Sequence, residues 1–444
     1  MPPSRLRGIS RRAALLAPLA LSGCGIWDDW FGTHKPRLPG KREQVMPLRH
    51  ALEMTGAPVR PTLPAPVRNA GWPQAGGNPA HLMGHLAAAP DLREAWSADI
   101  GAGGGYRRAL LAQPVVAAGQ VYTMDSRGFV SAFRLSDGRH LWRFDTRPKK
   151  DENFNVGGGL GIADGLLFAV NGLGALVALD AASGKLHWRQ DIGAPARSAP
   201  TIADGRVYFS TIEDKLLAHA VDDGRALWTY QAASTGQALL GQPAPAFADG
   251  LVVAGFGSGE LATLRADSGS VVWTDNLGTV DASSALAAFS SIRGLPVIAA
   301  STVFAIGVGG LMVALDLHSG RHLWERSVAG IDTPWVAGDW VFVVALDQKI
   351  AALNARDGSV GWVTQLPRFK NEKKQKHPIT WYGPVLASNR LVVAGTDQNA
   401  VAISPFTGAV LGRQRLSDAA AMGPILADGT LLLVTEDGRL RALR

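Results

Sequence analysis

Few side chains in this 444-residue chain have the type and spacing that catalysis or metal binding requires. Cys24 is the single cysteine, so neither an intrachain disulfide nor a Cys-x-x-Cys-His haem site can form. His81 and His85 are four residues apart, but no third metal ligand lies near them in the sequence. Three aspartates sit in positions of a repeat, where turn geometry explains them better than catalysis: Asp180, Asp316 and Asp437. These patterns favour a binding protein that is not an enzyme and has no metal site.

Cys24 itself is placed for covalent modification of its thiol. Residues 5–12 are basic, residues 13–21 are apolar, and Leu-Ser-Gly directly precedes Cys24. A basic segment, a short apolar segment and small residues before a cleavage point are the parts of an export signal, and small residues before a cysteine resemble a bacterial lipobox. We therefore predict that residues 1–23 are a signal peptide and that Cys24 becomes the N-terminal residue, modified with acyl chains such as palmitate.

The predicted lipoprotein is expected at the outer membrane, on its periplasmic face. The apolar run of the signal is shorter than the about 20 residues that span a bilayer, so the lipid would hold the protein at the membrane. Gly25 stands where lipoproteins retained at the inner membrane carry an aspartate. Because Ser10-Arg11-Arg12 resembles a twin-arginine signal, general export and twin-arginine export both stay open.

Composition indicates a turn-rich all-β protein and gives no reason to expect a nucleic-acid partner. The chain is 47% hydrophobic and 18% charged, with 52 glycines and 26 prolines. The formal net charge is +7, but four of the 44 basic residues lie in the predicted signal peptide, which leaves 40 basic against 37 acidic residues. A protein this close to charge balance lacks the electrostatic signature of nucleic-acid binding.

A repeat is the strongest pattern in the chain and begins after residue 100. Alternating apolar stretches of strand length are separated by Asp-Gly, Ser-Gly or Gly-Gly turns, as expected for antiparallel meanders. Six units carry a glycine four residues before a tryptophan: Gly138/Trp142, Gly184/Trp188, Gly224/Trp228, Gly269/Trp273, Gly320/Trp324 and Gly358/Trp362. In a seventh, Gly412 replaces the tryptophan. We predict eight propeller blades with the tryptophans packed between neighbours.

Closure of the ring is also visible in the sequence. The last unit, residues 424–443, ends before its outer strand, whereas the segment from Trp96 to Gly101 matches the segment from Trp188 to Gly193. Residues 92–99 should therefore complete the last blade. The predicted fold is all-β, an eight-bladed β-propeller of four-stranded antiparallel blades with an N-terminal strand paired to the C-terminal blade. The four predicted parts are the signal peptide 1–23, a lipidated proline-rich tether 24–71, a latch 72–91 and the propeller 92–444.

The repeats resemble those of quinoprotein dehydrogenases and their non-enzymatic relatives, most clearly over residues 178–188. Residues 72–78, Trp-Pro-Gln-Ala-Gly-Gly-Asn, are similar to the segment that precedes such propellers. With the lipobox and the proline-rich leader, the chain resembles the BamB family, the propeller lipoproteins of the outer-membrane β-barrel assembly machinery. The resemblance implies a non-enzymatic scaffold that binds the periplasmic domains of the barrel-inserting subunit and aids folding and insertion of nascent outer-membrane proteins.

The alternative is a periplasmic PQQ-dependent oxidoreductase or another ligand-binding propeller. Quinoprotein enzymes need a calcium site of carboxylates and an amide, an aspartate base and, in the alcohol dehydrogenases, two adjacent cysteines. The single cysteine excludes the last feature. The chain also has little insertion between blades from which to build a lidded pocket. We therefore expect no cofactor.

In the BamB family, loops between central blades are thought to contact the partner, and two such connections are long here. Residues 232–242 carry Leu239 and Leu240, and residues 281–295 carry Phe289, Ile292 and Arg293. Apolar side chains with an arginine on an irregular loop suit the centre of an interface. The alternative for Leu239 and Leu240 is that they cover the propeller rim. The acidic pair often found in the second loop of the family is absent.

Residues 370–376 form the one marked basic run. We expect a solvated loop here, and the alternative is contact with anionic lipid or a client peptide through screened attraction.

Overall fold

The computed structural model describes residues 51–54, 56–105, 109–147, 155–233, 241–278 and 291–444. These residues fall within one unit of the chain, residues 48–444. Their regular secondary structure consists of β-strands. No helix in this part of the chain is long and apolar enough to cross a membrane. Cys24 and the predicted signal peptide lie outside the described residues.

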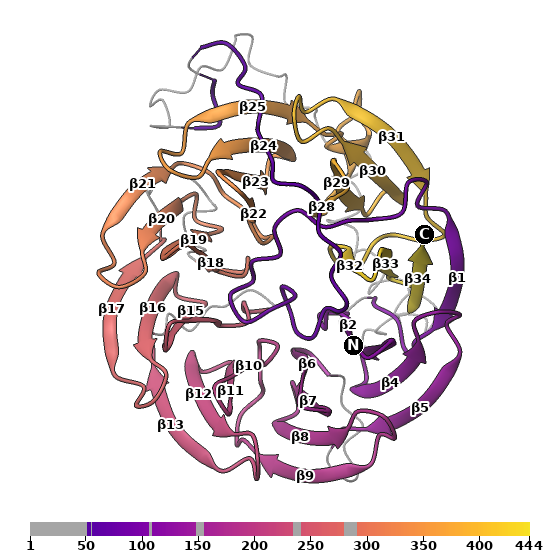
Figure 1. Ribbon diagram of the computed structural model, residues 1–444, viewed down its shortest axis with the longest axis vertical. Coiled ribbons are helices and arrows are strands. Elements are labelled where there is room, and N and C mark those ends of the chain that lie inside the picture. The colour runs from indigo at the N-terminus through magenta and orange to yellow at the C-terminus, as the bar shows by residue number, and fades with distance from the viewer. Residues whose placement is uncertain (1–50, 55, 106–108, 148–154, 234–240, 279–290) are drawn as a thin grey trace, which may run out of the picture. The chain divides into compact units, whose positions relative to one another are not determined.

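Eight four-stranded antiparallel sheets surround a central axis as the blades of a propeller (Figure 1). Blade 1 contains β2 (Val115–Ala117), β3 (Gln120–Met124), β4 (Phe129–Arg134) and β5 (His140–Asp145). Blade 2 contains β6 (Gly158–Ala163), β7 (Leu166–Asn171), β8 (Ala175–Asp180) and β9 (Leu186–Asp191). Blade 3 contains β10 (Thr201–Ala203), β11 (Arg206–Ser210), β12 (Lys215–Ala220) and β13 (Ala226–Gln231). Blade 4 contains β14 (Ala246–Ala248), β15 (Leu251–Gly255), β16 (Glu260–Arg265) and β17 (Val271–Asn276).

The remaining blades continue around the ring in chain order. Blade 5 contains β18 (Val297–Ala299), β19 (Thr302–Ile306), β20 (Met312–Asp316) and β21 (His322–Arg326). Blade 6 contains β22 (Trp335–Ala337), β23 (Trp340–Val344), β24 (Lys349–Asn354) and β25 (Val360–Gln365). Blade 7 contains β28 (Trp381–Ala387), β29 (Arg390–Gly395), β30 (Asn399–Ile403) and β31 (Val410–Arg415). Blade 8 contains β32 (Ile425–Ala427), β33 (Thr430–Thr435), β34 (Arg439–Leu443) and β1 (Glu94–Asp99). The predicted eight-bladed fold is confirmed.

Short turns fix the register of each meander. Asp204 and Gly205 connect β10 to β11 with positive φ angles of 50° and 68°. Positive φ at both central residues is the geometry of a type I′ hairpin, which matches the twist of the flanking strands. The repeated Asp-Gly pairs therefore specify hairpins.

The N-terminal strand closes the ring as the sequence predicted. β1 pairs antiparallel with β34, and Trp96 lies opposite Ala442. In blade 8 the chain order is β32, β33, β34 and then β1, so the outermost strand comes from the other end of the fold. Figure 1 shows β1 beside the C-terminal strands. The two ends of the propeller thus hold each other in one sheet.

A tryptophan joins each of seven blades to the next. The indole Nε1 donates to a backbone carbonyl of the following blade at 2.8–3.1 Å: Trp96 to Leu135, Trp142 to Ala181, Trp188 to Val221, Trp228 to Ala266, Trp273 to Leu317, Trp324 to Ala355 and Trp362 to Pro405. A Cβ atom on the repeat glycine of that next blade would lie only 2.5–2.8 Å from the ring. The glycine is therefore required so that the indole can pack flat, which confirms the predicted interblade role of the tryptophans.

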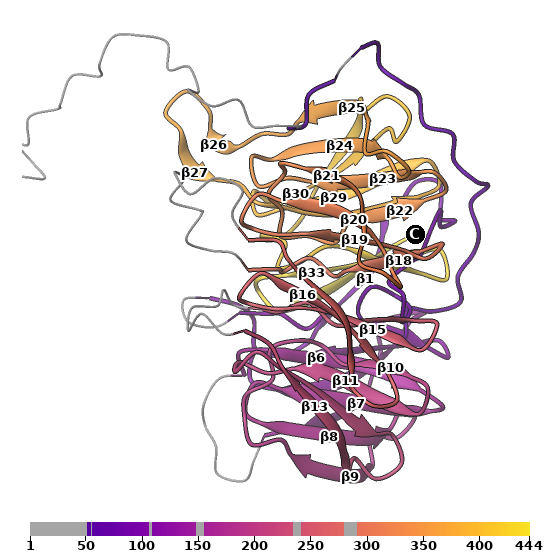
Figure 2. The same ribbon diagram turned by 90° about the vertical axis from the view of Figure 1, so that its left-hand side faces the viewer.

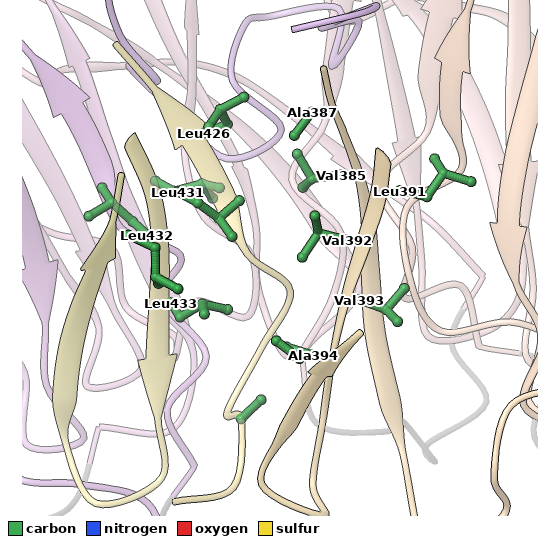
Figure 3. Close-up of a cluster of buried hydrophobic side chains, with 14 of the residues drawn as sticks. Val385, Ala387, Leu391, Val392, Val393, Ala394, Leu426, Leu431, Leu432 and Leu433 are labelled. Carbon is green, nitrogen blue, oxygen red and sulfur yellow. The ribbon is translucent and has the colours of Figure 1, made fainter. Parts of the chain in front are cut away.

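Aliphatic side chains fill the rest of each space between blades. Figure 3 shows the example of blades 7 and 8, where Leu431 and Leu433 of β33 point toward Val385 and Val392 of blade 7. Val393, the next residue of β29, points the other way, because side chains alternate between the faces of a strand. One sheet therefore buries both of its faces against its two neighbours.

The segment before β1 crosses the centre of the ring and touches every blade (Figure 1). Residues 69–86 hydrogen-bond to the innermost strand of each blade in turn: Trp72 to Val116, Pro73 to Ile162, Gln74 to Ile202, Pro79 to Phe247, Ala80 to Ile298, Gly84 to Trp335, Leu86 to Leu386 and Asn69 to Leu426. The segment thus covers the axis on one face of the ring.

The basic run 370–376 belongs to an exposed hairpin of β26 (Phe369–Asn371) and β27 (Lys376–Pro378). It is therefore solvated as expected, but it is an ordered two-stranded sheet and not an irregular loop. Figure 2 shows this hairpin on the side of the ring opposite the segment that crosses the axis.

Candidate functional site

All eight blades and the crossing segment contribute residues to a cavity of about 200 Å³ on the axis of the ring. Trp72 and His81 of the crossing segment line it on one side. Most of the remaining lining comes from the residues just before each innermost strand. We call this space the axial cavity.

The repeat explains why polar side chains meet there. Five lining residues stand three positions before the proline that precedes an innermost strand, and three of them, in consecutive blades, are polar: Arg197 before Pro200, Gln242 before Pro245 and Arg293 before Pro296. Equivalent positions of a repeat point in the same direction relative to the axis. The sequence pattern indicated a binding role for Arg293 alone, although the common spacing of Arg197 and Gln242 before their prolines is visible in the sequence as well.

The described lining of the axial cavity includes two guanidinium cations, Arg197 and Arg293, and one carboxyl group, Asp332. Arg197 donates to the carbonyl of Val156, and its burial lowers the pKa of the guanidinium. Burial raises the pKa of Asp332 to about 7, while a hydrogen bond from the backbone N–H of Gly383 and the charge of Arg293 act in the opposite direction. Asp332 therefore exchanges its proton near neutral pH, beside a guanidinium.

His81 is neutral in this setting. Burial lowers the pKa of its imidazole to about 4, against the opposing effect of the Pro296 carbonyl, which lies 2.7 Å from Nδ1. Since a carbonyl only accepts, Nδ1 carries the proton and Nε2 does not. His85, four residues later, has both ring nitrogens engaged in the segment that crosses the axis: its Nδ1 atom contacts the carbonyl of Pro64, and its Nε2 accepts from the backbone N–H of Asn389.

The donor set of the axial cavity does not fit the calcium ion that accompanies a quinone cofactor. Calcium binds six to eight oxygen ligands, several of them carboxylates. Among the described residues that line the cavity, Asp332 is the one carboxylate, and two guanidiniums accompany it. Within the described ranges, no group of three or more His, Cys, Asp or Glu side chains is placed to hold a metal ion.

The predicted partner-binding residues divide into three groups. Leu239, Leu240 and Phe289 lie outside the described residues. Ile292 is fully buried, its N–H donates to the carbonyl of Phe256, and its side chain packs against Gly255, so it anchors the connection and offers no surface to a partner. The prediction that Ile292 contacts a partner fails because the side chain belongs to the core between blades 4 and 5. Arg293, one residue later, is partly exposed.

Comparison with known proteins identifies the family. A family model described as outer membrane protein assembly factor BamB matches residues 126–364 and 346–444. The assembly factor BamB of Burkholderia pseudomallei is 28% identical over 364 residues, which cover 80% of this chain and 88% of that protein. The crystal structure of BamB from Moraxella catarrhalis superposes with a TM-score of 0.68 at 18% identity, over 80% of this chain and 99% of that one. Quinohemoprotein alcohol dehydrogenase from Comamonas testosteroni shares the propeller fold, with a TM-score of 0.63 at 15% identity over 85% of this chain and 81% of that one. Because the family model matches well over half of its length, the chain belongs to the BamB family of outer membrane protein assembly factors.

Proposed function

We propose that this chain is a non-enzymatic scaffold lipoprotein of the outer-membrane β-barrel assembly complex. In this role it binds the barrel-inserting subunit and aids the folding and insertion of nascent outer-membrane proteins. The observation that carries the proposal is the family match over nearly the whole ring, to relatives named as outer membrane protein assembly factors. Shared fold alone would not suffice, since the same propeller serves dehydrogenases.

The proposed contact surface is formed by the connections that lead into blades 4 and 5. It includes Leu239, Leu240, Phe289 and Arg293. The described parts of these two connections adjoin each other, because the Arg293 guanidinium lies 3.6 Å from the position of a Cβ atom on Gly241. Two adjoining connections with leucines and an arginine match the composition of interface centres.

The proposed lipid on Cys24 would hold the propeller at the outer membrane, facing the periplasm. The intervening segment is rich in proline and permits a large separation, since about forty residues extend to at most roughly 140 Å. The ring can therefore reach a partner that projects into the periplasm while the lipid stays in the membrane.

The direct test is retrieval of the barrel-inserting subunit by a tagged full-length chain expressed in its own cells. Arg293→Glu together with Leu239→Asp and Leu240→Asp is expected to reduce the retrieved subunit by at least tenfold, because charged groups would enter the desolvated centre of the contact. The matched control is Arg356→Glu, which breaks an exposed ion pair with Asp339 on blade 6 and is expected to leave retrieval unchanged.

Two further measurements complete the test. Deletion of the gene is expected to lower porin levels in the outer membrane, and Cys24→Ser is expected to release the protein into the soluble periplasmic fraction. Failure of the unaltered protein to retrieve the barrel-inserting subunit, with unchanged porin levels after deletion, would refute the proposed function.

A further inference from the structure

The hairpin of β26 and β27 concentrates positive charge on one exposed projection of the ring. Residues 368–378, which we call the basic hairpin, contain one acidic side chain, Glu372, and five basic ones: Arg368, Lys370, Lys373, Lys374 and Lys376. Residues 370–378 are all exposed. Among the described residues, none of the five cations forms an ion pair. Their charge is therefore available to a partner.

The base of the basic hairpin is fixed to the ring. The carboxylate Oε1 of Glu372 accepts from the backbone N–H groups of Arg368 at 2.7 Å and Phe369 at 3.1 Å, so backbone groups and not lysines bind it. The N–H of Ile379, a buried residue, donates to the carbonyl of Arg368 at 2.8 Å. A two-stranded hairpin is marginally stable by itself. These contacts hold it in place, and the lysines are presented from an ordered support.

The basic hairpin lies on the face where the N-terminal part of the chain meets the ring. It follows the end of β25 and projects on the side opposite the segment that crosses the axis (Figure 2). Ala51 and Leu52 line one groove together with Lys349 and Arg368, at the base of the hairpin. Ala51 comes 27 residues after Cys24, a length of at most roughly 95 Å when fully extended. A lipid on Cys24 would thus tether the ring at a point beside the hairpin.

We propose that the basic hairpin is a second membrane contact, which binds the surface of a bilayer that contains anionic phospholipid. Clustered lysines are attracted to an anionic lipid surface, and this attraction reaches about 10 Å at 0.1 M salt. The lipid keeps the hairpin near the bilayer, and the hairpin turns its own face of the ring toward it. This orientation rests on the proposed lipid at Cys24, whereas the affinity for anionic lipid does not.

The composition of the basic hairpin favours a lipid surface over a protein as the partner. Lysine is depleted at protein–protein interfaces, whose centres are rich in aromatic residues and arginine. Here four of the five cations are lysines, and the one aromatic ring, Phe369, is half-buried beside Arg368. The connections proposed to contact the barrel-inserting subunit follow β13 and β17, which, like β25, are the fourth strands of their blades. They leave the same face of the ring but combine leucines with an arginine.

The experiment is cosedimentation of the full-length chain carrying Cys24→Ser, which has no lipid of its own, with phospholipid vesicles. Binding is expected to vesicles of equal parts phosphatidylethanolamine and phosphatidylglycerol, and not to vesicles of phosphatidylcholine alone. It should be lost at about 1 M salt, where the screening length falls to about 3 Å. Lys370→Gln, Lys373→Gln, Lys374→Gln and Lys376→Gln together should lower binding by about a hundredfold or more, since each basic residue near an anionic surface contributes about fivefold.

The matched control removes four exposed basic residues from the other face of the ring: Arg139→Gln, Lys185→Gln, Arg225→Gln and Arg321→Gln. Each of these residues follows the repeat glycine in the turn between the third and fourth strands of its blade, at the opposite end of the fourth strand from the connection that carries the hairpin. The net charge falls by the same amount and the N-terminal segment is shared, but vesicle binding is expected to stay unchanged.

Three outcomes would overturn the proposal. They are equal binding to neutral and anionic vesicles, equal binding by the lysine variant and the control, and a lysine variant that keeps its vesicle binding but no longer retrieves the barrel-inserting subunit. The last result would assign the basic hairpin to a protein contact. The scaffold function is judged separately, by retrieval with the unaltered protein, so a failure of the membrane contact and a failure of the scaffold function are distinguishable.

Discussion

Seven of the junctions between blades are closed by an indole, whereas the junction between blades 7 and 8 is closed by a guanidinium. Gly412 of β31 stands where the other blades carry the tryptophan. Across from it, Leu92 takes the place of the repeat glycine, four residues before Trp96, and keeps a positive φ of 46°. At this junction the small residue therefore lies on blade 7 and the larger residue on blade 8, the reverse of the other seven junctions.

Arg390 of blade 7 replaces the hydrogen bond of the missing indole. Ala89 corresponds to the acceptor residue of the other junctions, since its N–H donates to the carbonyl of Gly429 as that of Leu135 does to Gly119. The carbonyl of Ala89 accepts from Nη2 of Arg390 at 2.7 Å, and Nη1 of Arg390 donates to the carbonyl of Pro90.

Arg390 does not fill the volume that an indole ring occupies at the other junctions. A cavity of about 240 Å³, lined by Leu92, Arg390 and Gly412, stays beside this junction. The comparison shows that the hydrogen bond of a junction can be supplied by another residue type, whereas the packed area of an indole, about 150–250 Å², cannot. We therefore expect the junction that contains both ends of the propeller to open first.

The largest expected effect comes from removal of an indole. Trp273→Ala deletes a ring that is 9% exposed and bonded to the Leu317 carbonyl, and should lower the free energy of unfolding by about 3–5 kcal/mol. Urea denaturation followed by far-UV circular dichroism measures the free energy of unfolding of the variant and of the unaltered protein. A loss below about 1 kcal/mol would show that the indoles do not hold the junctions together.

The second largest effect is expected from loss of the guanidinium hydrogen bonds of Arg390 at the junction between blades 7 and 8. Arg390→Met keeps an unbranched side chain but leaves the carbonyls of Ala89 and Pro90 without their donor, which should cost about 1–3 kcal/mol. Hydrogen exchange is expected to quicken in β1 and β34 and to stay unchanged in blades 3 and 4. Uniform quickening around the ring would contradict a local role for Arg390.

The sequence predicted the strands, the closure by β1 and the tryptophan junctions because each depends on a repeat. It also marked Gly412 as an exception, but not the response of Arg390 and Leu92, since that depends on the path by which residues 89–92 enter blade 8. The axial cavity was missed for a similar reason. Its spacing before the prolines is periodic, yet only the orientation of the blades shows that Arg197 faces the axis while Ile292 faces the core.

A smaller gain is expected if the eighth junction is rebuilt like the others. Gly412→Trp alone should not stabilise the protein, because the ring would meet Leu92 where the other indoles meet a glycine. Combined with Leu92→Gly, it should raise the stability by about 1–2 kcal/mol through the buried ring. A double-mutant cycle in urea measures the coupling between the two substitutions, and additive effects would show that they do not share one space.

The smallest effect compares two glycines of β31 and its turn. A Cβ atom on Gly412 meets nothing within 4 Å, and its φ is not positive, so Gly412→Ala should stabilise by about 0.5–1 kcal/mol through the reduced freedom of the unfolded chain. Gly408→Ala is the matched control: with a φ of +72° and the ring of Trp362 at 2.6 Å from its Cβ position, it should destabilise instead. Thermal unfolding of both variants measures the change in stability of each. A change of the same sign in both would contradict the inference that Gly408 lies against an indole ring and Gly412 does not.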